Sequence, residues 1–304
     1  MSFRKFYKVA GTTIQVISEY PISENTFHPK FKTFEVKGPG SDTVTIYHHF
    51  NLPELDKKIQ TNKNKIYHKD QWQIFKTDMS WNYYYTSLSR EDFVQKALGV
   101  MNNDYRSIHI YTKDLTRKKY SKGRFNALTL FNTDQMIFAK LLSDRNGVMI
   151  HSNGFDLNGN GILLAGVSGS GKSTLSGMLK KQGHKILCDD RMFIRKIESE
   201  FWIFGNWCYG SHPDVSSSSA PLKGFLFLEK GIKNHIKQIK QPSMIASLLL
   251  KVIVKPLLDV NGWKKYFSTI ETLSKKARFF RLEFDLSGDI CDVLNTFFKS
   301  EKNF

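Results

Sequence analysis

The sequence contains few cysteines and no long apolar run. Its three cysteines, Cys188, Cys208 and Cys291, are widely spaced and odd in number, which argues against a disulfide framework or a zinc site. The longest apolar stretch, Met244 to Val254, is interrupted by Lys251 and is too short to cross a bilayer. The N-terminus also lacks the apolar segment of a signal peptide. These absences predict a soluble, cytoplasmic protein that has no membrane partner.

Acidic residues are scarce relative to basic ones. The 304 residues include 45 Lys and Arg against 28 Asp and Glu, so the formal net charge is +17. Such an excess attracts nucleotides, phosphorylated metabolites, acidic peptides, nucleic acid or anionic membranes, and charge alone does not choose among them. The excess of basic residues is concentrated between residues 221 and 283, a segment that contains thirteen basic and four acidic residues. A solvated lysine-rich surface is an equal alternative for this segment.

The first part of the chain, up to about residue 111, is rich in β-branched and aromatic residues separated by turn signals. This pattern is typical of an antiparallel sheet, with one isolated helical pattern at residues 91–98. The predicted strands include residues 12–17, 42–47, 72–75 and 81–85.

The pattern changes near Asn132 and Thr133, either of which can cap a helix. From there apolar strands alternate with amphipathic helices, which predicts an α/β fold with a β-rich region at residues 1–125 and a second domain at residues 126–304. Strands are expected at 148–151, 162–165, 185–188, 225–228 and 279–285, a hairpin at 193–203, and later helices at 244–254, 262–277 and 289–298.

A glycine-rich loop follows the strand at residues 162–165. Residues 166–173 have the sequence Gly-Val-Ser-Gly-Ser-Gly-Lys-Ser, which completes the pattern G-x-x-x-x-G-K-[ST] between an apolar strand and an amphipathic helix. Glycines let backbone N–H groups point at phosphates, and the N-terminus of the following helix adds to that attraction. Lys172 is expected to reach the β- and γ-phosphates of Mg-ATP, and the Ser173 hydroxyl to ligate Mg²⁺. The predicted nucleotide-binding residues are Gly166, Ser168, Gly169, Ser170, Gly171, Lys172, Ser173 and Thr174.

Two adjacent carboxylates, Asp189 and Asp190, end the next strand after this helix. A parallel sheet would place them beside the phosphates, where one binds Mg²⁺ and the other accepts a proton from the attacking hydroxyl. We assign Mg²⁺ to Ser173 and Asp190. A turn or helix cap in which Arg191 pairs with one carboxylate is the alternative. His151 precedes the loop strand, so it is either a further residue of the same cleft or a satisfied histidine at a strand end.

Two further observations narrow the class of protein. A Ras-like GTPase would need an N-K-x-D motif, which the sequence does not contain. The polar segment at residues 205–220 is long for a connection and is interpreted either as a lid beside an active site or as an exposed loop. Together the motifs favour a kinase whose predicted catalytic residues are Asp189, Asp190, Lys172 and His151.

Residues 162–174 and 185–191 resemble the core of the HPr kinase/phosphorylase group, which is structurally akin to phosphoenolpyruvate carboxykinases. Residues 219–229 are similar to HPr-kinase-related proteins found beside peptide-modification genes. The resemblance implies a β-rich first half before a P-loop kinase domain, transfer of phosphate from ATP to a serine hydroxyl, one of Asp189 and Asp190 as the general base, and possible assembly into a homo-oligomer. The Glu-x-Arg-Gly signature of true HPr kinases is absent, which favours another peptide, protein or small hydroxyl compound as acceptor.

Two alternatives remain open. A nucleotide-gated binding module would recognise an acidic partner through the basic segment at residues 221–283. A carboxykinase-like enzyme would act on a small acid, although the chain is short for that class. Nucleic-acid binding is the least favoured function, because net charge supports it but no recognised nucleic-acid-binding module is present.

Overall fold

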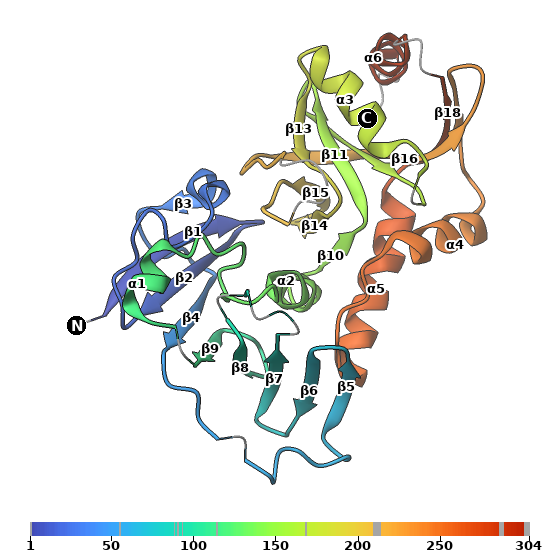
Figure 1. The fold of residues 1–304 in the computed structure, drawn as a ribbon. Coiled ribbons are helices and arrows are strands. Elements are labelled where there is room, and N and C mark those ends of the chain that lie inside the picture. The colour runs from blue at the N-terminus through green and yellow to red at the C-terminus, as the bar shows by residue number, and fades with distance from the viewer. Residues whose placement is uncertain are drawn as a thin grey trace. The chain divides into compact units, whose positions relative to one another are not determined.

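The computed structural model describes residues 2–54, 56–87, 89, 91–92, 94–113, 115–167, 169–208, 214–285 and 289–300 (Figure 1). The chain divides into two compact units, Met1–Ile137 and Phe138–Phe304. No helix in this part of the chain combines the length and hydrophobicity needed to cross a membrane.

In the first unit, the described residues form a nine-stranded sheet with the order β3-β1-β2-β4-β9-β8-β7-β6-β5. A short 3₁₀ helix, η1 (Pro29–Phe34), and α1 (Arg117–Lys122) accompany it, and α2 (Asp134–Ser143) begins at its end. The strands are β1 (Phe3–Val9), β2 (Thr12–Ser18), β3 (Glu35–Val36), β4 (Thr43–His49), β5 (Lys65–Lys69), β6 (Trp72–Lys76), β7 (Ser80–Thr86), β8 (Lys96–Asn102) and β9 (Ser107–Thr112).

The expectation of an antiparallel sheet is wrong at its centre. β4 runs parallel to both β2 and β9, while the other neighbouring strands are antiparallel. Parallel neighbours need long connections, and residues 19–42 and 50–106 provide them. The predicted helix at residues 91–98 is also wrong, because β8 begins at Lys96 and its residues pair with β7 and β9 on both sides. Long-range pairing there overrides the local helical pattern.

The second unit is built on a mixed sheet with the order β10-β14-β15-β16-β12-β11-β13, extended from β16 by β18 and then β17. The predicted apolar strands and later helices are confirmed. Two strands, β11 and β17, were not predicted. The elements are β10 (Gly147–Ile150), β11 (Ser152–Leu157), β12 (Asn160–Ala165), α3 (Lys172–Lys181), β13 (Lys185–Cys188), β14 (Met192–Ile197), β15 (Glu200–Phe204), β16 (Ser219–Lys230), β17 (His235–Gln238), α4 (Pro242–Val252), α5 (Val260–Lys276), β18 (Phe279–Phe284) and α6 (Ile290–Ser300).

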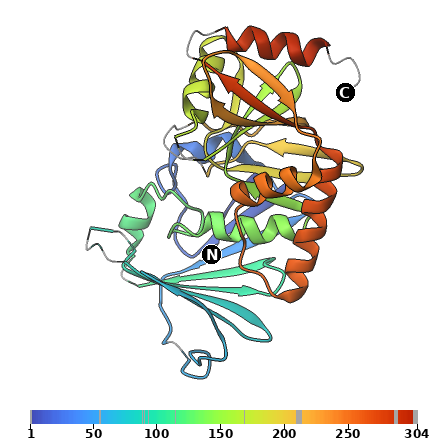
Figure 2. The same ribbon diagram turned by 90° about the vertical axis from the view of Figure 1, so that its right-hand side faces the viewer.

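Helices cover both faces of this sheet, as Figures 1 and 2 show. Leu163 of β12 is buried in a cluster with Leu249 of α4, and α5 contributes to the same cluster. The next residue, Leu164, is buried in the other cluster with Leu175 of α3 and Leu294 of α6. A strand covered on both faces must be apolar on both, which explains the unbroken apolar run of β12.

Candidate functional site

Three chain segments of the second unit meet at the sheet edge that is formed by the last residues of β12 and β13 and the first residues of β11. β11 lies between β12 and β13 and is antiparallel to both, with Ser152 opposite Ala165 and Gly154 opposite Cys188. β12 and β13 therefore end at the edge where β11 begins. A parallel sheet was predicted at this position from the sequence. The structure instead interposes an antiparallel strand, yet it still brings the glycine loop, the Asp pair and His151 together.

The glycine loop adopts a backbone that only glycine accommodates easily. Gly169 and Gly171 have φ angles of +78° and +96°, in the left-handed region. A Cβ atom on Gly171 would also lie 2.6 Å from Cζ of Phe284, and one on Gly166 would lie 2.5 Å from Oγ of Ser170. The helix α3 begins directly after Gly171, as predicted. The loop and the helix start are thus packed too tightly for larger side chains.

Of the remaining predicted loop residues, Ser168 lies outside the described residues. Thr174 is exposed on the first turn of α3. The Ser170 hydroxyl is buried, and no hydrogen-bond partner for it is found within the described chain.

Lys172 is folded into the loop. Its side chain is largely buried, with the residue 9% exposed. Nζ donates hydrogen bonds to the carbonyl oxygens of Gly166 at 2.8 Å and Val167 at 3.2 Å. Burial lowers the pKa of Lys172, and the charges of Asp190 and Asp189 oppose that shift. The ammonium group is therefore held at the centre of the loop, close to both carboxylates.

The two adjacent aspartates have different partners. Asp189 is buried, and its Oδ1 accepts a hydrogen bond of 3.3 Å from the Ser173 hydroxyl. Asp190 has a φ angle of +87°, which turns its carboxylate another way. Its Oδ1 lies 2.8 Å from Nδ1 of His151, and its Oδ2 lies 2.7 Å from Nη1 of Arg191. One carboxylate thus contacts the start of α3, and the other forms a charged cluster with His151 and Arg191.

His151 is surrounded by charged groups. Its Nδ1 also contacts Nη1 of Arg191. Burial lowers the pKa of His151, the charges of Arg191 and Lys172 lower it further, and Asp190 raises it. The net direction is downward, so the imidazole is favoured in its neutral form near pH 7.

Asn153 was not identified from the sequence. The residue is 1% exposed, its Oδ1 accepts a 3.1 Å hydrogen bond from the backbone N–H of Asp190, and its Nδ2 donates to Oγ of Ser176 in α3 at 2.9 Å. Asn153 therefore ties the left-handed backbone of Asp190 to the helix that follows the glycine loop. No motif points to it, because the contact depends on the register between β11 and β13.

A second asparagine supports the residue after the Asp pair. Nδ2 of Asn206 donates to the backbone oxygen of Arg191 at 2.7 Å, and its Oδ1 accepts from the N–H of Cys208 at 2.8 Å. Asn206 is the second residue of the polar segment at residues 205–220, which was interpreted as a lid or an exposed loop. Residues 209–213 of that segment lie outside the described residues. Its later part packs beside the site, since Val215 forms a β-bridge with Cys188.

The sequence is similar to that of proteins named HPr kinase/phosphorylase. No family model matches the chain. A protein named HPr kinase/phosphorylase from Peptoclostridium acidaminophilum is 29% identical over 163 residues, which cover 53% of this chain and 46% of the relative. One of the same name from Clostridium botulinum (strain Eklund 17B / Type B) is 23% identical over 252 residues, covering 77% of this chain and 69% of the relative.

Among solved structures, the HPr(Ser) kinase/phosphatase from Coxiella burnetii aligns with 51% of this chain and 90% of its own, at 12% identity and a TM-score of 0.30. A TM-score this low does not establish a common fold. The structure defines a mixed α/β protein with a glycine loop between a buried strand and a helix. The curated relatives described here share the name HPr kinase/phosphorylase, and the chain is similar to them at low identity and over part of their length.

Proposed function

We propose that the chain is an ATP-dependent kinase that transfers the γ-phosphoryl group to a serine-type hydroxyl of a peptide, a protein or a small molecule. The observation that carries this proposal is the meeting of the glycine loop, Asp189 and the Asp190–His151 pair at one sheet edge. The names of the relatives support the same class of reaction.

The glycine loop would bind the phosphates of ATP. Its left-handed glycines and the N-terminus of α3 direct N–H groups into the loop, a known arrangement for anion binding. Nζ of Lys172 already donates to two loop carbonyls, and phosphate oxygens are stronger acceptors because they are charged. The side chain would thus exchange carbonyl partners for phosphate oxygens without leaving the loop.

The donor set beside the loop fits Mg²⁺. Hydroxyl and carboxylate oxygens are ligands that Mg²⁺ accepts, and it usually takes its remaining ligands from water and phosphate. Ser173 and Asp189 present such oxygens 3.3 Å apart. This favours Asp189 as the carboxylate partner of Ser173, whereas the sequence assignment named Asp190. Within the described chain, no group of three or more His, Cys, Asp or Glu side chains forms a metal site by itself. When bound, Mg²⁺ neutralises charge on the phosphates.

Asp190 is then available as the general base. The acceptor hydroxyl gives its proton to this carboxylate while its oxygen forms a bond to the γ-phosphorus, and the bond from that phosphorus to the bridging oxygen breaks to release ADP. His151, neutral near pH 7, has Nδ1 2.8 Å from Oδ1 of Asp190 and would orient the carboxylate in the tautomer that carries its proton on Nδ1. Arg191 pairs with the other carboxylate oxygen and fixes its direction.

The experiment follows the γ-phosphate of labelled ATP, with Mg²⁺, into an extract of the source organism and into purified HPr. We expect a labelled acceptor with the natural protein and none with Lys172→Ala. Lys181→Ala is the matched control, because it removes an exposed lysine from the last turn of the same helix and should leave labelling unchanged. ATP binding without any labelled acceptor would contradict the kinase and favour the nucleotide-gated binding module.

A further inference from the structure

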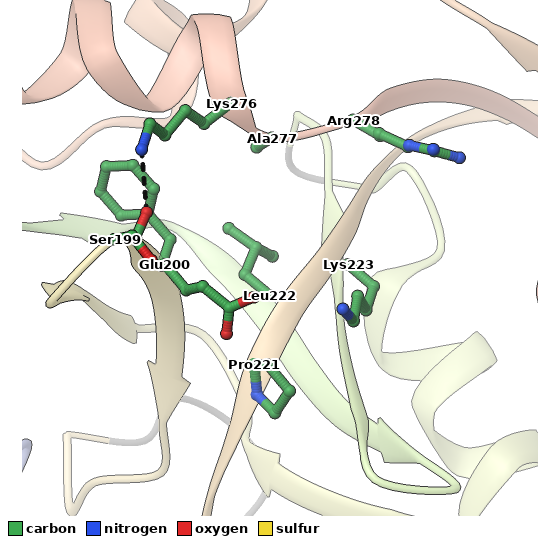
Figure 3. A pocket seen from close by; sticks show the side chains of 9 residues that line it. Ser199, Glu200, Pro221, Leu222, Lys223, Lys276, Ala277 and Arg278 are labelled. Carbon is green, nitrogen blue, oxygen red and sulfur yellow. Dashed lines mark hydrogen bonds between the residues drawn. The ribbon is translucent and has the colours of Figure 1, made fainter. Parts of the chain in front are cut away.

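The second unit contains a cavity of about 260 Å³ whose basic side chains do not form one site (Figure 3). Lys223 and Arg278 lie on one side of β16 and Lys276 on the other. Nζ of Lys276 donates to the backbone oxygen of Ser199 at 2.9 Å. The cavity lies where β15 and β16 begin, whereas the glycine loop follows the end of β12, which is parallel to β16. It is therefore at the other end of these strands from any nucleotide held by the glycine loop.

The glycine loop has two flanks, which are formed by different strands of the sheet. On one flank, β11 and β13 bring His151 and the Asp pair to the loop. On the other flank, β16, β18 and β17 follow β12 in that order. β16 is parallel to β12, and β18 is parallel to β16, so these three strands end at the edge where the loop begins. The proposed phosphoryl transfer uses the first flank only.

The second flank packs directly against the glycine loop. A Cβ atom on Gly166 would lie 3.5 Å from the backbone oxygen of Leu228 in β16, and one on Gly171 would lie 2.6 Å from Cζ of Phe284 in β18. β16 ends two residues after Leu228. The β16–β17 connection, residues 231–234, therefore leaves the sheet beside the loop.

The β16–β17 connection is fixed to the end of β18. Oδ1 of Asn234 accepts a 3.1 Å hydrogen bond from the backbone N–H of Asp285, and Nδ2 of Asn234 donates to Oδ1 of Asp285 at 3.4 Å. A Cβ atom on Gly231 would lie 2.8 Å from Cβ of Glu283, so the backbone packs closely there. Ile232 is thus presented from an anchored base.

Two exposed apolar side chains lie at this edge. Ile232 is 91% exposed, and Val167, in the glycine loop, is 68% exposed. Single exposed apolar residues are common on protein surfaces and indicate no function by themselves. These two follow the ends of the neighbouring strands β16 and β12, on the flank that the phosphoryl transfer does not use. They offer apolar surface to a molecule that is held by the loop.

We propose that Ile232 and Val167 form the nucleoside side of the site and pack against the base of ATP. This inference rests on the proposed kinase function, in which the γ-phosphate lies beside Asp189 and Asp190. ATP joins its base, ribose and three phosphates end to end, so a γ-phosphate on the Asp flank directs the base towards the opposite flank. Apolar side chains commonly line the part of a binding site that holds a planar ligand.

Titration calorimetry of the full chain with Mg-ATP and with Mg-tripolyphosphate tests the proposal. Tripolyphosphate has the phosphate chain without the nucleoside, so it reports on the glycine loop alone. Ile232→Ala should weaken ATP binding about fivefold, as expected for the loss of roughly one buried methylene group, and should leave tripolyphosphate binding unchanged. Val167→Ala should act in the same direction. Ile232→Leu keeps the apolar volume and should bind ATP as the natural protein does.

Two variants control for location. Met79→Ala removes an apolar side chain that is 81% exposed in the first unit, and it should leave the affinity for both ligands unchanged. Lys172→Ala should weaken both ligands, because it changes the loop itself. The side chains of Ile232 and Met79 are exposed, so their replacement should leave the thermal midpoint nearly unchanged, which shows that these variants are folded.

Three outcomes would overturn the proposal. Equal weakening of ATP and tripolyphosphate by Ile232→Ala would show a disturbance of the loop and no contact with the base. Unchanged ATP affinity would remove the base contact, and a raised KM for the acceptor in the same variant would assign the connection to the acceptor. Both results leave the kinase proposal intact. Failure of ATP and tripolyphosphate to bind the natural protein would instead remove the nucleotide site, and both proposals with it.

Discussion

The two sheets differ in how their buried polar side chains are satisfied. In the first unit, His48 is fully buried, and its Nδ1 and Nε2 lie 3.0 Å from the Tyr120 hydroxyl and 2.8 Å from the Leu128 carbonyl oxygen. Both partners are neutral. In the second unit, the buried polar groups Lys172 and Asp189 gather with Asp190 at one sheet edge. Charged groups there lie close to one another rather than being separated by core.

The difference between the two units is clearest in the surroundings of two buried or half-buried histidines, His48 and His151. Burial lowers the pKa of His48 to about 4, and its backbone hydrogen bond opposes that shift only in part. Burial also lowers the pKa of His151, but there three charged neighbours act on the ring as well. The first histidine is a neutral cross-link between segments of a core. The second belongs to a charged cluster at the end of a strand, and a group perturbed by burial and by specific charged neighbours is a candidate for a functional site. Changes in the two regions should therefore have different consequences.

The largest expected effect follows removal of the Asp190 charge. Asp190→Asn should lower the rate of phosphoryl transfer about 10³-fold, because the acceptor hydroxyl loses its base. Asparagine tolerates the left-handed backbone at this position, so the fold should persist. Steady-state kinetics with the acceptor measures the rate, and calorimetry with ATP should still detect binding. Asp156→Asn is the matched control; the carboxylate of Asp156, near the end of β11, accepts a hydrogen bond from the backbone N–H of Gly159. Full activity of Asp190→Asn would contradict the assignment.

This site could be predicted from sequence only in part. The glycine pattern, the buried strand before it and the helix that begins at Lys172 are local features, and all of them were predicted. The two carboxylates were predicted to lie beside the loop because they end the next apolar strand. The strand β11, which lies between β12 and β13, was not predicted. It begins with the polar sequence Ser152-Asn153-Gly154, and such a run carries no strand signal.

The different contact partners of the two carboxylates depend on long-range geometry. Asp190 meets His151 across 39 residues of sequence, through the register of β11 with β13. The parallel position of β4 between β2 and β9 depends likewise on segments far apart in the chain. Spacing and propensity describe neighbours along the chain, so they predicted the elements of the fold better than the order of its strands.

The second-largest expected effect is that of Asn153→Ala, which should lower both the unfolding free energy and the rate of phosphoryl transfer. Asn153→Ala removes the partners of the half-buried Asp190 N–H and of the buried Ser176 hydroxyl, and leaving both groups unsatisfied should cost about 3 kcal/mol of unfolding free energy. If Asn153 positions Asp190, kcat should also fall while the KM for ATP changes little. Asn261→Ala on the exposed start of α5 is the control. Lower stability with unchanged kcat would leave Asn153 a structural role only.

In the first unit the corresponding effect is on stability alone, and it depends on pH. The folded pKa of His48, about 4, lies below the unfolded value near 6.5, so the unfolded chain binds a proton first as pH falls. Stability from this residue is complete above pH 6.5 and is lost as pH falls towards 4. Between pH 7 and pH 5 the loss should be about 2 kcal/mol. Urea unfolding at both values measures it, and His48→Gln should reduce the pH dependence by that amount. An unchanged dependence would show that His48 does not titrate in this range.

The smallest expected effect is the loss of an exposed ion pair in the second unit, which tests whether charged pairs there are strong wherever they occur. Lys180 at the end of α3 pairs with Asp214 on the surface, far along the helix from the glycine loop. The Lys180 side chain is 60% exposed, so water and salt screen the pair, and its loss should cost less than about 1 kcal/mol. A double-mutant cycle of Lys180→Ala and Asp214→Ala, repeated in 1 M salt, measures the coupling and should find it abolished by salt. A coupling free energy of several kcal/mol that survives 1 M salt would contradict this expectation. Exposed ion pairs would then be as strong as those around Asp190, and the charged cluster there would not differ from the surface in this respect.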